Sequence, residues 1–172
     1  MMRLSFLVKS LPALSLACAA LLSGCAQPAR QLPTDASSSH HWSGRMALQV
    51  QDAQQQSFSA SFELQGQPER GTLLVFSPLG STIARLQWTQ SGASLQQGDQ
   101  LTQSDSLPEL ITKMTGSDIP VAALFDWLQG KNTVVSGWQT DLSRVSEGRL
   151  RADRVSPPPE ASLRIVLDQD PR

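Results

Sequence analysis

The 172-residue sequence has no tyrosine, only two cysteines and only two histidines. Cys18 lies in an N-terminal segment that we expect to be removed, which leaves Cys25 alone and allows no intramolecular disulfide. The sequence also lacks a phosphate-binding glycine loop of the P-loop or dinucleotide type. With no free cysteine nucleophile, no histidine base in the expected folded region and no cofactor motif, we expect neither an enzyme nor a bound cofactor.

Clusters of metal-ligating or catalytic side chains are equally scarce. His40 and His41 are adjacent, but a zinc site normally needs three or four ligands, and no cysteine or acidic cluster lies near them. We therefore expect no metal site. Asp105 and Glu109 are two carboxylates, which a glycosidase would use as an acid and base pair. One caps a predicted helix and the other precedes it, so we interpret them as structural and consider a cell-wall hydrolase the weakest alternative.

An excess of basic residues is absent too. The chain has 14 lysines and arginines against 15 aspartates and glutamates, a formal net charge of −1. Nucleic-acid-binding domains present a basic patch or stripe, so we expect no nucleic-acid partner. At this length a single domain with one core is the default expectation.

No hydrophobic run is long enough to span a bilayer. The longest, Leu11–Leu22, has about a dozen residues, whereas a transmembrane helix needs roughly 20. It follows Arg3 and Lys9, and a charged segment before a short apolar one is typical of an export signal.

The run ends in Leu22-Ser23-Gly24-Cys25, which resembles the bacterial lipobox. The resemblance implies that residues 1–24 are cleaved and that Cys25 carries a diacylglyceryl thioether and an acylated amine. Several acyl chains together make a durable anchor. Lipoproteins retained in the inner membrane usually carry aspartate after the cysteine. Because residue 26 is Ala, we expect the periplasmic face of the outer membrane; an ordinary signal peptide containing a cysteine is the alternative.

The rest of the chain divides into a tether and a domain. Residues 25–41 are rich in Pro, Gln, Ser and Ala and cannot form a core, so we expect a flexible tether. From residue 42 to 172 we expect one folded domain. Apolar and polar residues alternate over Met46–Val50 and Phe58–Leu64, which indicates two strands joined by a turn at Gln51–Gln56.

Further strands are predicted at Gly71–Phe76, Thr82–Trp88, Ala93–Gln97 and Ser162–Asp168. Short consecutive strands with polar turns favour an antiparallel meander with one wetted face. We expect Trp138 to pack at a strand edge.

Two helices interrupt the strands. Ser106 with Glu109 forms a capping-box pattern, and Gly116 stands where a C-cap glycine would end the first helix. The second begins near Pro120 and ends at Gly130. Because both helices have an apolar stripe, we expect them to lie on the apolar face of the sheet.

The apolar face covered by the helices has two interpretations. If the helices pack tightly it is a core, and if they can lift, the same residues line a cavity for a hydrophobic ligand. Periodicity does not separate the two. The candidate cavity residues are Phe58, Phe62, Leu64, Leu74, Phe76, Leu86 and Trp88 of the strands, with Ile111, Met114, Leu124 and Leu128 of the helices.

An ordered set of short segments resembles the LolB family of outer-membrane lipoprotein receptors. The segments are Trp42–Ala47, Ser59–Phe62, Ser77–Thr82, Met114–Gly116, Ile119–Val121, Leu124–Gly130 and Gly137-Trp138. The resemblance implies a mainly β fold, an incomplete antiparallel β-barrel whose hydrophobic cavity is closed by a lid of short helices. It also implies that the cavity accepts the acyl chains of lipoproteins from the periplasmic carrier LolA and that the protein inserts this cargo into outer-membrane lipid, without ATP. We expect a monomer.

The loop Pro78-Leu79-Gly80 is the second expected site. Pro presets one turn residue and Gly permits a positive φ, so the turn is tight and Leu79 projects from its tip. The alternative conformation is one in which the Leu79 side chain folds back on the core. The family's loop carries an exposed leucine at the matching position, and this implies contact with lipid during insertion.

The sequence departs from the family pattern after Gly130. Six residues separate Gly130 from Gly137, where the family has a longer stretch, and the tyrosines that are common after the Gly-Trp pair are absent. We expect the segment Arg149–Pro159 to be reduced or rebuilt. The remaining alternative function is a membrane-tethered structural or adaptor lipoprotein that does not bind acyl chains.

Overall fold

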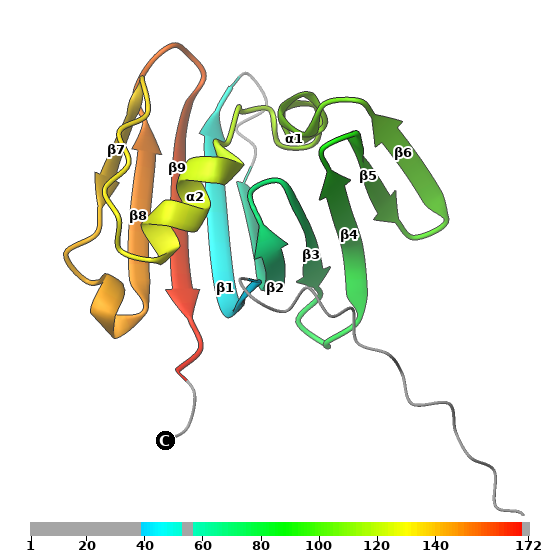
Figure 1. The fold of residues 1–172 in the computed structure, drawn as a ribbon, viewed down its shortest axis with the longest axis horizontal. Coiled ribbons are helices and arrows are strands. Elements are labelled where there is room, and N and C mark those ends of the chain that lie inside the picture. Colours follow the sequence, from blue (N-terminus) through cyan, green and yellow to red (C-terminus); the bar gives the residue numbers. More distant parts are fainter. Residues whose placement is uncertain (1–38, 53–56, 170–172) are drawn as a thin grey trace, which may run out of the picture. The chain divides into compact units, whose positions relative to one another are not determined.

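A computed structural model describes residues 39–52 and 57–169, all within the unit formed by residues 36–172. In these residues nine strands form one antiparallel sheet with the order β6-β5-β4-β3-β2-β1-β9-β8-β7 (Figure 1). The edges are β6 and β7, so the sheet does not close into a full barrel. The predicted incomplete barrel with a helical lid is confirmed.

The first half of the sheet is a meander of consecutive hairpins. Its strands are β1 (His40–Gln51), β2 (Ser57–Gln67), β3 (Arg70–Phe76), β4 (Thr82–Thr89), β5 (Gly92–Gln97) and β6 (Gln100–Ser104). The predicted alternation is visible in β2, where Phe62 and Leu64 are buried and Ser61 and Glu63 lie on the other face. The sequence-based interpretation identified all of these strands except β6.

The second half returns to the start of the chain. It contains β7 (Trp138–Asp141), a short 3₁₀ helix (Val145–Glu147), β8 (Arg149–Arg154) and β9 (Glu160–Leu167). β9 pairs with both β8 and β1, so the last strand lies beside the first (Figure 1). The segment after residue 149 is thus an integral part of the sheet. Trp138 begins the edge strand β7, as expected.

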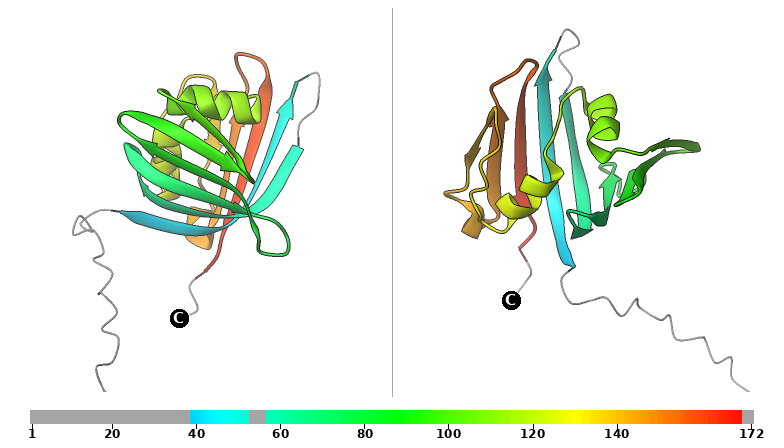
Figure 2. Two further views of the ribbon diagram at one scale, coloured as in Figure 1. Left: turned by 90° about the vertical axis from the view of Figure 1, so that its right-hand side faces the viewer. Right: turned by 45° about the horizontal axis from the view of Figure 1, so that its top comes forward.

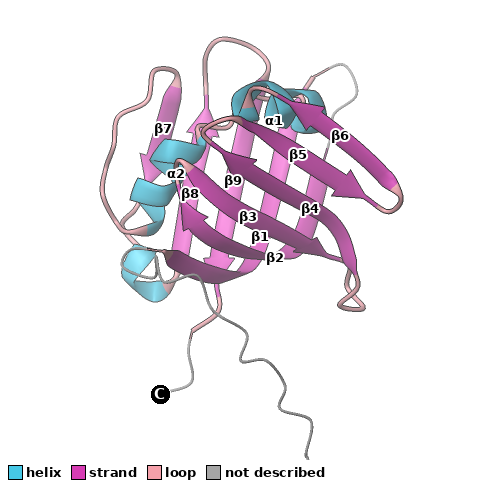
Figure 3. Cartoon of the chain, turned by 45° about the vertical axis from the view of Figure 1, so that its right-hand side comes forward, coloured by secondary structure: helices cyan, strands magenta, loops and turns pink. Residues whose placement is uncertain are grey.

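Two helices lie on the concave face of the curved sheet (Figures 2 and 3). α1 (Leu107–Thr115) begins after Ser106, whose Oγ accepts a hydrogen bond from the Glu109 amide at 3.3 Å. It ends at Gly116, which has a positive φ of 72° and donates its amide to the Thr112 carbonyl. Both predicted caps are confirmed. α2 (Val121–Leu128) follows Pro120 and stops two residues before Gly130.

One expectation about the histidines is wrong. β1 begins at His40, before the expected domain boundary, so His40 and His41 belong to a strand. The His40 ring stacks on Trp42 with the ring centres 5.0 Å apart. The signal peptide, Cys18, Cys25 and residues 26–38 of the expected tether lie outside the described residues.

Candidate functional site

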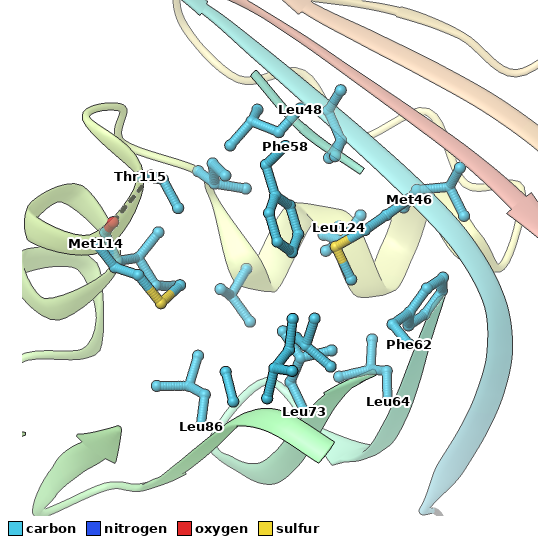
Figure 4. Close-up of a pocket in the computed structure, with 18 of the residues that line it drawn as sticks. Met46, Leu48, Phe58, Phe62, Leu64, Leu73, Leu86, Met114, Thr115 and Leu124 are labelled. Carbon is cyan, nitrogen blue, oxygen red and sulfur yellow. Dashed lines mark hydrogen bonds between the residues drawn. The ribbon is translucent and has the colours of Figure 1, made fainter. Parts of the chain in front are cut away.

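An apolar cavity of about 550 Å³ lies between the sheet and the two helices (Figure 4). Its wall combines side chains of β1 to β5 and β9 with side chains of α1 and α2. Sites for small molecules typically have volumes of roughly 300–1,000 Å³ and mostly apolar walls. The apolar face is therefore not a filled core: the helices cover the sheet and leave space beneath them.

The structure places most of the expected cavity residues on this wall. Figure 4 shows side chains from strands and helices pointing into a common space, among them Phe62, Met114 and Leu124. The expected residues that line the cavity are Phe58, Phe62, Leu64, Leu86, Trp88, Ile111, Met114, Leu124 and Leu128.

Leu74 and Phe76 do not line the cavity, and the expectation for these two residues is wrong. Leu73 and Val75 take their places on β3. Leu73 pairs with Leu64 of β2 and Leu86 of β4, both of which line the cavity. Because neighbouring residues in a strand point to opposite faces, Leu74 lies on the outer face.

Sequence reasoning missed the contribution of β1 and β9. Met46, Leu48 and Val50 line the cavity from β1, and Leu163 and Ile165 line it from β9. Their alternation was visible in the sequence and was used to predict strands. What was missing was the pairing of β9 with β1, which brings the two segments to one wall. Ile119, just before α2, and Val121, its first residue, were also missed.

Buried aromatic side chains pack together at one end of the cavity, where Trp88 lines the wall. Phe125 of α2 is fully buried and makes edge-on contacts with Trp42, at 5.4 Å between ring centres, and with Trp88, at 6.3 Å. Trp42 is near the start of β1 and Trp88 near the end of β4, and the strand register places both at the same end of the sheet. The Trp88 Nε1 donates to the carbonyls of Gln67 and Pro68, which fixes the ring at this end.

The opposite end is open. Phe58 and Ile83 line the cavity and are still 40% and 42% exposed. Ser57 and Gln97 are also on the wall and exposed. These residues start β2 and β4 and end β5, so they share the end of the sheet opposite Trp42 and Trp88. The cavity thus has an aromatic base and an exposed mouth.

The loop between β3 and β4 stands at the mouth end. The Gly80 amide donates to the Ser77 carbonyl at 2.9 Å, the Ser77 amide donates to the Ser81 carbonyl at 2.9 Å, and Gly80 has a φ of 83°. Leu79 at its tip is 94% exposed. The loop has the predicted tight geometry, and Leu79 is not folded back on the core. Ile83 of the mouth follows it on β4.

Charged side chains are absent from the cavity wall formed by the described residues. The groups with shifted pKa values lie elsewhere: hydrogen bonds from Ser143 lower the pKa of Asp141, and the Arg144 guanidinium lowers the pKa of Glu147. Glu109 accepts a hydrogen bond from Ser104 Oγ at 3.4 Å, and its amide donates to Ser106 Oγ, which caps α1. The wall therefore offers apolar contact and no acid or base.

Among residues 39–52 and 57–169, no group of three or more His, Cys, Asp or Glu side chains is arranged to hold a metal ion. No helix in the same described ranges is long and apolar enough to cross a membrane.

A protein-family model described as "Outer membrane lipoprotein LolB" matches residues 38–155. The outer-membrane lipoprotein LolB of Bordetella petrii is 28% identical over 175 residues, which cover 87% of this chain and 88% of that protein. The LolB of Cupriavidus necator is 34% identical over 137 residues, covering 76% and 68%. The LolB of Azoarcus sp. strain BH72 is 29% identical over 184 residues, covering 92% and 94%.

Proposed function

Because this chain belongs to the LolB family of outer-membrane lipoproteins, we propose that its cavity accepts the acyl chains of lipoproteins from the periplasmic carrier LolA and that it inserts this cargo into the outer membrane. The observation that carries the proposal is the apolar cavity with buried aromatic residues packed at one end and an open mouth at the other. Its wall suits an unbranched hydrocarbon chain, whose charged or polar head would remain at the mouth.

Transfer of this kind makes and breaks no covalent bond. Burial of an acyl chain is favourable by about 0.8 kcal/mol per methylene group. When the chain moves from one apolar cavity to another, most of this free energy is retained, so the direction depends on which cavity is the better host. No ATP is needed, because the bilayer is the final and most favourable apolar environment.

In this proposal, the loop at Pro78-Leu79-Gly80 contacts the membrane. A leucine that is 94% exposed leaves almost all of its side chain in water. Insertion into a bilayer would bury it, and its position at the mouth end of the sheet would bring the cavity opening to the lipid surface. Leu79 then touches the membrane as cargo leaves.

The anchor belongs to the same proposal. Cleavage after residue 24 and acylation of Cys25 would hold the protein at its target membrane, with residues 26–39 linking the anchor to the first strand of the domain. A fixed receptor needs only to capture cargo and release it locally, and it can function as a monomer.

Binding of a fluorescent fatty acid tests the cavity. Leu73 and Leu74 are consecutive, half-buried residues on opposite faces of β3, and only Leu73 lines the cavity. Leu73→Trp would fill part of the space and should weaken binding at least about tenfold, since displaced methylene contacts cost about 0.8 kcal/mol each. Leu74→Trp is the matched control and should bind like the unchanged protein.

Competition completes the test. A lipoprotein should displace the probe, whereas its unacylated form should not. If the unchanged, folded protein binds no acyl probe, the alternative of a tethered structural or adaptor lipoprotein is correct. Equal loss of binding in the Leu73→Trp and Leu74→Trp variants would also contradict the assignment of this cavity as the acyl site.

A further inference from the structure

Four arginines lie on the outer face of the sheet, opposite the cavity. β8, β9 and β1 are adjacent (Figure 1). Leu150 and Ala152 of β8 are buried, and Leu163 and Ile165 of β9 line the cavity. The residues between them point the other way. These outward residues include Arg45, Arg149, Arg151 and Arg164, all exposed, which we call the outer arginine cluster.

The strand register brings the four side chains together. Arg151 pairs directly with Arg164, and Val166 pairs with Arg45 on one side and Arg149 on the other. Directly opposed side chains have Cβ atoms roughly 4.5–5.5 Å apart, and like charges at that spacing destabilise a sheet. The directly opposed pair of Arg151 and Arg164 therefore carries a cost in stability that a bound anion would offset.

Acidic residues neutralise only part of the cluster. Asp153 binds Arg151 Nε at 2.7 Å, and Glu147, which binds Arg144, is close enough to Arg149 to be influenced by its charge. Glu160 and Asp168 lie toward the ends of β9, and Glu63 of β2 lies on the same face, diagonal to Arg45. Within the described part of the chain, Arg45, Arg149 and Arg164 form no ion pair. Three of the four guanidinium groups are thus available to an anion.

The cluster continues toward the loop that carries Leu79. Arg149, Val166, Arg45, Ser61 and Phe76 follow one another across five neighbouring strands. Neighbouring strands are about 4.8 Å apart. Phe76 is the last residue of β3, and the Ser77–Ser81 loop follows at once. The arginines and the exposed leucine therefore belong to one connected surface.

We infer that the outer arginine cluster binds the phosphate groups of anionic phospholipids, so that the outer face of β8, β9 and β1 lies against the bilayer while Leu79 enters it. Guanidinium groups bind phosphate oxygens in a bidentate way. Val166, 50% exposed between Arg45 and Arg149, adds an apolar contact. This inference rests on the proposed function, since it gives Leu79 its approach to the membrane.

We favour lipid over an acidic protein partner because the members of this family are outer-membrane lipoproteins. A protein that is anchored in a membrane is always close to a bilayer surface. Each basic residue near an anionic lipid surface strengthens association by about fivefold. Neutralising three of them should lower the ratio of docked to undocked domain by on the order of 100-fold. High salt should also weaken docking of the domain on the vesicle, because it screens exposed charges.

The experiment uses the mature lipidated protein in vesicles of phosphatidylethanolamine, with and without phosphatidylglycerol. A Val166→Cys substitution provides a thiol for an environment-sensitive fluorophore on the outer face. The test variant carries Arg45→Gln, Arg149→Gln and Arg164→Gln. The control carries Lys113→Gln, Lys131→Gln and Arg144→Gln, which remove the same charge from exposed positions outside the cluster. Circular dichroism checks that both variants fold.

We expect a blue shift of the fluorophore that requires phosphatidylglycerol, persists in the control and is lost in the test variant. A shift of equal size without phosphatidylglycerol, or one retained in the test variant, overturns the inference. A shift that appears only when an acidic carrier protein is added also overturns it and assigns the face to a protein partner.

Acyl-probe binding, measured on the same samples, separates the two proposals. The test variant should bind the probe normally, because its substitutions lie on the opposite face from the cavity. If the unchanged protein does not bind the acyl probe, the proposed function is rejected. The fluorophore shift on vesicles then still decides whether the outer arginine cluster binds anionic lipid.

Discussion

At the residue scale, Leu79 has the highest exposure among the large apolar side chains of the described residues. Leu79→Glu should leave the fold intact, because the side chain makes no buried contact to lose. It should abolish delivery of lipoproteins into membranes, since a carboxylate is expensive to place in hydrocarbon. The measurement is transfer of a lipoprotein from its complex with LolA to outer-membrane vesicles, together with a thermal unfolding curve.

Val134 provides a matched control for this prediction. It is 89% exposed and lies in the loop between α2 and β7, away from the Ser77–Ser81 loop. Val134→Glu introduces the same charge at an exposed apolar position and should preserve delivery. Normal transfer by a folded Leu79→Glu variant would remove the membrane role of this loop.

Gly137 illustrates a residue whose role is structural. It has a φ of 81°, and its carbonyl accepts the amide of Val155 at 2.8 Å. A Cβ atom here would overlap the carbonyl oxygen of Ser156, whereas a Cβ at Gly98, which also has a positive φ, meets nothing within 4 Å. Gly137→Ala should lower the free energy of unfolding by about 3 kcal/mol, and Gly98→Ala by about 1 kcal/mol. Urea denaturation gives both values. Similar losses in the two variants would show that backbone strain alone, and not the overlap, determines the cost.

The misplacement of Leu74 and Phe76 shows a limit of sequence patterns at this scale. Leu73-Leu74-Val75-Phe76 is an uninterrupted apolar run, so it contains no alternation from which to assign a face. Only the pairing of Leu73 with Leu64 and Leu86 decides which residues point inward. In β2, where serines and apolar residues alternate, the inward residues were predicted correctly.

At the scale of elements, the caps of α1 could be predicted from the sequence because each cap involves residues only a few positions apart. Ser106 accepts the amide of Glu109, and the helix then covers part of the cavity with Ile111 and Met114. Ser106→Ala should reduce the free energy of unfolding by about 1 kcal/mol, the usual cost of losing such a cap. Ser106→Asp keeps a capping oxygen and should restore most of it. Chemical denaturation of the two variants checks the prediction, and equal stability of Ser106→Ala and the unchanged protein would contradict it.

The strands that sequence reasoning missed have weak local signals. β8 contains only Leu150 and Ala152 as inward apolar residues, between arginines and an aspartate. β6 and β7 are the edge strands, with four or five residues each, and Leu101 of β6 is largely exposed. Short edge strands bury little, so their sequences are not constrained to alternate strongly. Their place in the sheet is fixed by their partners.

At the scale of the whole domain, the pairing of β1 with β9 joins the beginning and the end of the described chain. Local sequence patterns cannot predict this pairing, because paired residues such as Met46 and Ile165 are more than a hundred positions apart in the sequence. The family match ends at residue 155, yet β9 supplies Leu163 and Ile165 to the cavity and pairs on both sides. We therefore expect β9 to be essential to the fold.

Truncation after Ser156 tests this expectation. The shortened chain would leave β1 and β8 without their shared neighbour and would open the cavity wall at Leu163 and Ile165. Loss of two well-buried leucine or isoleucine side chains costs on the order of 4–10 kcal/mol, which is comparable with the whole stability of a domain of this size. We expect no cooperative unfolding transition by circular dichroism and no acyl-probe binding. Truncation after Gln169, which retains β9, should preserve both. A cooperative transition in the chain that ends at Ser156 would show that β1 to β8 fold independently of their central partner.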